Sequence, residues 1–92
     1  MTDLTSSRAY TSSNSSVSGT SATIVAAGTY SYWITIQNTH ASQKLSLSFN
    51  NPATTSDLTL AAGQWITLTP GATNTLYGIG SGASTTYAIM GA

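Results

Sequence analysis

The chain has 92 residues, enough for one domain, and carries formal charge only at Asp3, Arg8, Lys44 and Asp57. Charged residues make up 4% of it, against about 25% in ordinary soluble domains, and cysteine is absent. These numbers exclude disulfide scaffolds and thiolate chemistry, and they argue against nucleic-acid binding, which needs clusters of Lys and Arg. Because the net charge is zero, little repulsion keeps copies apart, and assembly is favoured.

The first twenty residues are nearly all Ser, Thr, Asn and Gly, with few large apolar side chains among them. Such a segment cannot bury a core by itself. We therefore expect residues 1–20 to form an extended arm that is flexible or lies on a neighbour. No apolar run approaches the roughly 20 residues that cross a bilayer, and no basic start with an apolar stretch indicates a secretory signal.

From residue 21 onward the pattern changes to short apolar runs separated by turn residues such as Gly, Pro and Asn. Runs at this spacing predict an all-β fold, a single small antiparallel β-sandwich or jelly-roll-like domain over residues 21–92. About seven short strands are expected: Ala22–Ala26, Tyr30–Asn38, Lys44–Asn50, Asp57–Leu60, Gln64–Thr69, Thr75–Ile79 and Thr85–Met90.

Alternation within these strands predicts which side chains face the core. Leu45, Leu47 and Phe49 share one face of their strand, and the serines between them share the other. A core built from two or three such residues per strand is small, and a domain of this size without a disulfide or metal is marginally stable alone. Oligomerisation is therefore the expected stabiliser.

Catalytic and metal-binding residues are scarce in this sequence. His40 is the only histidine, it lies in a polar loop, and no motif ties it to Asp3 or Asp57. Two carboxylates and one imidazole are too few for a zinc site and weak for calcium. We predict no enzyme activity, no cofactor and no metal.

The aromatic residues offer the best candidates for binding. Trp33 and Trp65 each fall on the hydroxyl-rich face of their strand, away from its aliphatic residues. A large aromatic side chain on such a face is typical of a protein interface or of a stacking surface for sugars, unless a bulge or sheet edge brings the ring into the core. The candidate interface residues are Leu4, Tyr10, Val17, Trp33, Trp65 and Tyr77.

Three features follow one another along the chain. They are an Ile-x-Asn strand within Tyr32–Asn38, a Leu-x-Ala-Gly turn within Leu58–Leu68, and then Leu76–Ile79 before a Gly- and Ser-rich hairpin and a short last strand. In these features, which span about three quarters of the chain, the sequence resembles small β-sandwich virion proteins of tailed bacteriophages, where they recur in the same order.

The resemblance implies a capsid decoration or cement protein on the virion surface. Such a protein would bind the major capsid protein at junctions between capsomers, often as a homotrimer, with its terminal arm on the shell. A tail, neck or fibre subunit is an alternative within the virion. A carbohydrate-binding module that uses Trp33, Trp65 and tyrosines is an alternative from another class.

Overall fold

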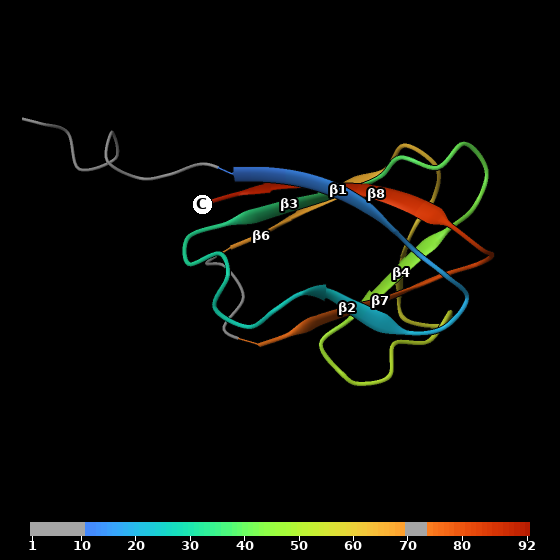
Figure 1. Ribbon diagram of the computed structural model, residues 1–92, viewed down its shortest axis with the longest axis horizontal. Coiled ribbons are helices and arrows are strands. Elements are labelled where there is room, and N and C mark those ends of the chain that lie inside the picture. The colour runs from blue at the N-terminus through green and yellow to red at the C-terminus, as the bar shows by residue number, and fades with distance from the viewer. Residues whose placement is uncertain (1–10, 70–73) are drawn as a thin grey trace, which may run out of the picture.

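The computed structural model describes residues 11–69 and 74–92, which form eight strands and no helix (Figure 1). This confirms the predicted all-β sandwich, and each of the seven expected strands is present: the first five are shorter than expected, the sixth is shifted by one residue, and the last is one residue longer. The strands are β1 (Thr11–Val17), β2 (Ala22–Val25), β3 (Ile34–Asn38), β4 (Leu45–Ser48), β5 (Leu58–Leu60), β6 (Trp65–Leu68), β7 (Leu76–Gly80) and β8 (Thr85–Gly91).

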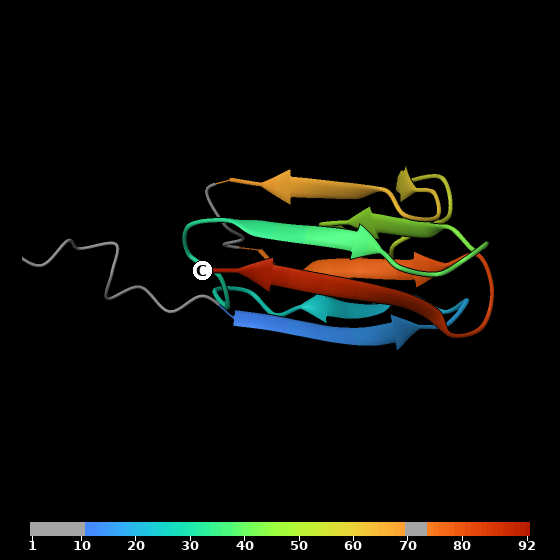
Figure 2. The same ribbon diagram turned by 90° about the horizontal axis from the view of Figure 1, so that it is seen from above.

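The strands form two four-stranded sheets that face each other. Sheet A has the order β1-β8-β3-β6 and sheet B the order β2-β7-β4-β5, with every neighbouring pair antiparallel. Figure 2 shows the four strands of sheet A side by side, with β1 at one edge and β6 at the other. Except for the β4–β5 hairpin, each connection carries the chain from one sheet to the other.

The core lies between the sheets and is built by alternation, as the sequence predicts. Ile34 and Ile36 of β3 are fully buried, and Leu45 and Leu47 of β4 face them from sheet B. The remaining buried members of this core come from six other parts of the chain: Val17, Val25, Tyr30, Leu60, Leu76, Tyr87 and Ile89.

Strand β1 lies in the segment that the sequence assigns to the arm. Its seven residues pair with β8 from Thr11 opposite Gly91 to Val17 opposite Thr85, so residues 11–17 are an edge strand of sheet A. Six of the seven side chains are exposed. The segment is held through the backbone ladder, which explains why its side chains show no amphipathic pattern. Of the rest of the expected arm, residues 18–20 lie between β1 and β2, and residues 1–10 lie outside the described residues.

Gly78 allows two sheet B strands to pack closely over the core. A Cβ atom at this position would lie 2.6 Å from Cγ1 of Ile24 in β2 and 3.5 Å from Cδ2 of Leu47 in β4. The distance to Ile24 is too short for two carbon atoms, whereas the distance to Leu47 is an ordinary contact, so a side chain here would displace Ile24. The glycine therefore lets two neighbouring aliphatic side chains occupy the space above β7.

Candidate functional site

His40 organises a loop in this structure. Its Nδ1 accepts hydrogen bonds from the backbone N–H groups of Ser42 at 3.0 Å and Gln43 at 2.9 Å. Its own backbone N–H donates to Oδ1 of Asn38 at 2.9 Å. Because Nδ1 already serves two backbone donors, the imidazole acts here as the acceptor that shapes the turn between β3 and β4.

Asp57 has a similar local role before β5. Its Oδ2 accepts a hydrogen bond from the backbone N–H of Thr54 at 2.7 Å and one from Oγ1 of the same residue at 3.2 Å. A carboxylate that accepts both donors closes the turn over residues 54–57. Over residues 11–69 and 74–92, no group of three or more His, Cys, Asp or Glu side chains could hold a metal ion.

The candidate interface residues fall in three environments. Leu4 and Tyr10 lie outside the described residues. Val17 was expected to contribute to an interface, but it is 4% exposed and belongs to the core, because it is the last residue of β1 and points between the sheets. Tyr77 is half-buried on β7, opposite Thr23 and Ser48 on the outer face of sheet B.

The two tryptophans lie on one surface, the outer face of sheet A. Trp33 precedes β3 and is half-buried, whereas Trp65 on β6 is 63% exposed and pairs with Gln37 of β3. Trp65 therefore has the outward direction expected from the sequence. Strand geometry puts the two residues roughly 14 Å apart, four residues along the strand and one strand over.

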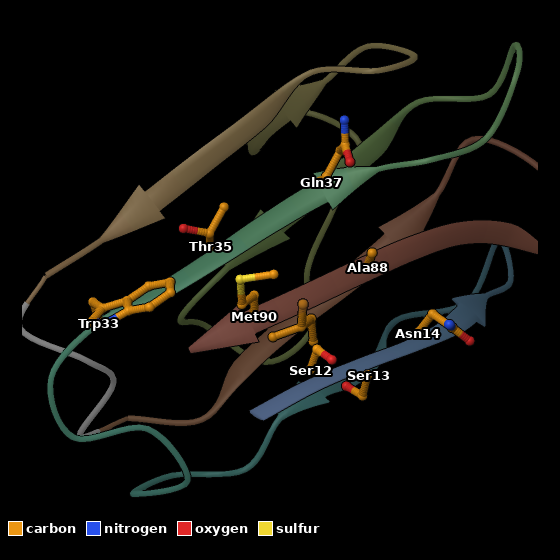
Figure 3. Close-up of a pocket in the computed structure, with 9 residues that line it drawn as sticks. Ser12, Ser13, Asn14, Trp33, Thr35, Gln37, Ala88 and Met90 are labelled. Carbon is orange, nitrogen blue, oxygen red and sulfur yellow. The ribbon is translucent and has the colours of Figure 1, made fainter. Parts of the chain in front are cut away.

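A groove of about 470 Å³ crosses this face (Figure 3). Its lining comes from β1, β8 and β3 and from the residue before β3. The outer face of β8 contributes Ala88 and Met90, while Thr35 and Gln37 come from β3. Hydroxyl, amide, methyl and indole groups thus meet on one surface, and none of the lining side chains is charged. We call it the sheet A groove.

A second concave surface opens at the edge of the sandwich where β5 and β6 lie. It has a volume of about 120 Å³ and is almost entirely apolar. Phe49 is 48% exposed and Leu58 is 55% exposed beside it. Ile66 and Leu68 of β6 are partly buried and pack against the core. We call this surface, lined by Leu47, Ser48, Phe49, Leu58, Ile66, Leu68 and Leu76, the β5–β6 slot.

The slot differs from the core pattern expected from sequence. Phe49 and Leu58 have the alternation of inward residues, but Phe49 follows the end of β4 and Leu58 begins the three-residue edge strand β5. No strand of the described chain covers them on the outside. Ser46 differs in the opposite sense. The sequence predicts it on the solvent-exposed face of its strand, but it is 2% exposed, and its Oγ forms a hydrogen bond of 2.8 Å with Oγ1 of Thr59.

Comparison with protein-family models, with curated proteins and with solved structures finds no match to this chain. In the part of the chain that the structure describes, no helix is long and apolar enough to cross a membrane. The interpretation of the two surfaces therefore depends on their own geometry and chemistry.

Proposed function

We propose that this chain is a non-enzymatic structural subunit that is completed by its neighbours in a larger assembly. The resemblance of its sequence leads us to propose, more specifically, a decoration protein on the capsid surface of a tailed bacteriophage. Its partners would then be the major capsid protein and other copies of itself, in a homotrimer. The observation that carries the proposal is the β5–β6 slot.

Exposed apolar side chains at a sheet edge favour association. Phe49 and Leu58 are both about half exposed, and the strands β5 and β6 beside them each have a partner on one side only. Free edges offer unpaired N–H and C=O groups to another chain, and proteins that stay monomeric usually protect them with charge, proline or a bulge. None of the residues that line the slot is charged.

The composition supports the same conclusion. Of the side chains in the described ranges, only Lys44 and Asp57 carry a formal charge. Association therefore requires little desolvation of ionic groups, and the buried apolar area adds directly to the stability of a contact. A subunit whose core is small gains the most from such a contact, because burial at the interface extends its own interior.

The mechanism we propose is mechanical. A neighbouring subunit covers Phe49 and Leu58 and pairs with the free edge of β5 or β6, which adds both apolar burial and backbone hydrogen bonds across the boundary between subunits. Contacts of this kind resist the separation of capsomers under internal pressure. No reacting group is needed for such a role.

The test compares two charge insertions in the purified protein. Leu58→Asp places a carboxylate at the slot, whereas Thr23→Asp places one at an exposed position on β2, away from it. Native mass spectrometry is expected to find an oligomer for the wild-type protein and for T23D, and a monomer for L58D. A wild-type protein that remains monomeric and does not bind capsid shells would contradict the proposal.

Binding to intact particles separates the remaining alternatives. The number of copies per virion distinguishes a decoration protein from a tail, neck or fibre subunit. The contribution expected of the arm is tested by deleting residues 1–10 alone, because residues 11–17 belong to sheet A. We expect the shortened protein to keep its fold and to lose occupancy on the shell.

A further inference from the structure

The sheet A groove has a defined origin in the strand register. Ala88 of β8 lies between Asn14 of β1 and Gln37 of β3 in one row across the sheet. The methyl group of Ala88 is much smaller than the amide side chains on either side, so the sheet surface is hollow at that point. Figure 3 shows Asn14 and Gln37 flanking the groove above Ala88, with Trp33 at one end.

The two amides are suited to binding hydroxyl groups. Gln37 donates from Nε2 to the carbonyl of Gly63 at 3.1 Å, which fixes the side chain and leaves its Oε1 as an acceptor. The side chain of Asn14 makes no hydrogen bond to any described residue and is exposed beside the groove. An amide both donates and accepts, so these groups match a ligand that carries many hydroxyls.

Rigid and apolar groups complete the surface. Oγ1 of Thr35 is held by Oγ1 of Thr67 at 2.8 Å, and the Met90 side chain, 54% exposed, lies between Ser12 and Thr35 in the next row. The Trp33 indole lines one end of the groove, and the exposed indole of Trp65 on the same face offers an electron-rich surface to C–H groups. The groove therefore combines one aromatic surface, apolar contacts and fixed polar groups, as small-molecule sites generally do.

Charge determines which hydroxyl-rich ligand fits. Among the described residues, Lys44 lies just before β4 and Asp57 just before β5, both in the other sheet, and neither lines the groove. Among the described residues of this face, a phosphorylated or sulfated ligand would find no cation to compensate for its desolvation. The chemistry on this face is that of a neutral ligand with hydroxyl groups on its edges and C–H groups on its faces.

We propose that the sheet A groove binds a neutral oligosaccharide, with Asn14 and Gln37 bonding to the hydroxyls of a sugar ring in the groove. The exposed Trp65 lies on the same face opposite Gln37, so a chain of several sugars that leaves the groove in that direction stacks a ring on this indole. This site goes beyond the structural role, because the groove and the β5–β6 slot lie on different surfaces and can be occupied together.

The test uses a panel of neutral hexasaccharides, namely those of β-1,4-glucan, mannan, xylan and chitin, with a heparin hexasaccharide as the charged comparison. Binding to the purified full-length protein is measured by isothermal titration and by quenching of tryptophan fluorescence. At least one neutral hexasaccharide is expected to bind, and heparin is not. If no neutral member binds at millimolar concentration, or if heparin binds best, the proposal is overturned.

Two variants then locate the site. Ala88→Leu fills the hollow without touching the core, and Asn14→Ala removes an amide that makes no hydrogen bond to the described protein. Each is expected to weaken binding by about tenfold or more. Tyr77→Ala, on the outer face of sheet B, is the matched control and should bind as the wild type does. Unchanged affinity in both groove variants, with folding confirmed by circular dichroism, would place the sugar elsewhere and overturn the assignment.

Discussion

Asn38 and Leu60 are joined by a hydrogen bond that crosses between the two sheets. Nδ2 of Asn38, in β3 of sheet A, donates to the carbonyl oxygen of Leu60, in β5 of sheet B, at 2.9 Å. The same nitrogen donates to the carbonyl of Gln43 at 2.8 Å, and Oδ1 accepts the backbone N–H of His40. Asn38 is fully buried, so one amide side chain ties both sheets and the intervening loop together.

Replacement of this amide should be costly. Asn38→Leu keeps a similar volume but leaves two carbonyls and one N–H without their partner, and we expect the free energy of unfolding to fall by about 3 kcal/mol. Urea denaturation measures the change. The control is Asn50→Ala, at an exposed position, which should change stability by less than about 0.5 kcal/mol. Equal stability of the two variants would mean that the bonds of Asn38 do not hold the sheets.

Gly91 is predicted to be the more sensitive of two glycines. A Cβ atom on Gly91 would lie 2.7 Å from the carbonyl oxygen of Trp33 and 2.6 Å from Cδ1 of Tyr30. The backbone oxygen cannot move without disturbing β3, so Gly91→Ala should cost about 1–3 kcal/mol and lower the melting temperature. At Gly19 the nearest atom would be 3.9 Å away, and Gly19→Ala should leave the melting temperature almost unchanged. A similar loss in both variants would count against this explanation.

The strands from residue 22 onward could be predicted from the sequence, because apolar and polar residues alternate along a half-buried strand and turn residues mark its ends. The sequence was not sufficient for β1, in which only Val17 is buried. That strand is stabilised by its backbone ladder with β8. The pair at one end of this ladder, Thr11 and Gly91, is some eighty residues apart along the chain. No side-chain pattern encodes such a pairing, since polar strands specify their register weakly.

The two candidate binding surfaces could be predicted only in part from the sequence. The alternation of inward and outward residues along its strand was enough to predict that Trp65 points outward. The groove itself depends on the register that aligns Asn14, Ala88 and Gln37, which come from three distant segments. The slot depends on strand order: Leu58 has an inward pattern and is exposed because β5 is short and lies at an edge. Register and strand order are tertiary properties, and local periodicity does not contain them.

Thr85 allows the removal of a single buried hydroxyl to be tested. Its Oγ1 donates to Oε1 of Gln43 at 2.6 Å and lies 3.2 Å from the carbonyl of Gly82, and the residue is fully buried. Thr85→Val preserves the shape and removes the donor, so the free energy of unfolding should fall by about 1–2 kcal/mol in urea denaturation. Thr86→Val, the exposed neighbour, is the matched control and should have little effect. If T86V is as destabilising as T85V, the loss does not come from the buried bond.

His40 should protect two backbone amides from exchange with solvent. Its Nδ1 accepts from Ser42 and Gln43, so His40→Ala should speed amide hydrogen exchange at both positions by removing their acceptor. His40→Asn is the informative comparison, because an asparagine oxygen can accept the N–H two residues later and so should restore protection at Ser42 more than at Gln43. Exchange followed by NMR distinguishes the variants. Unchanged rates in H40A would show that the loop keeps its shape without the imidazole, and that the histidine is held there for another reason.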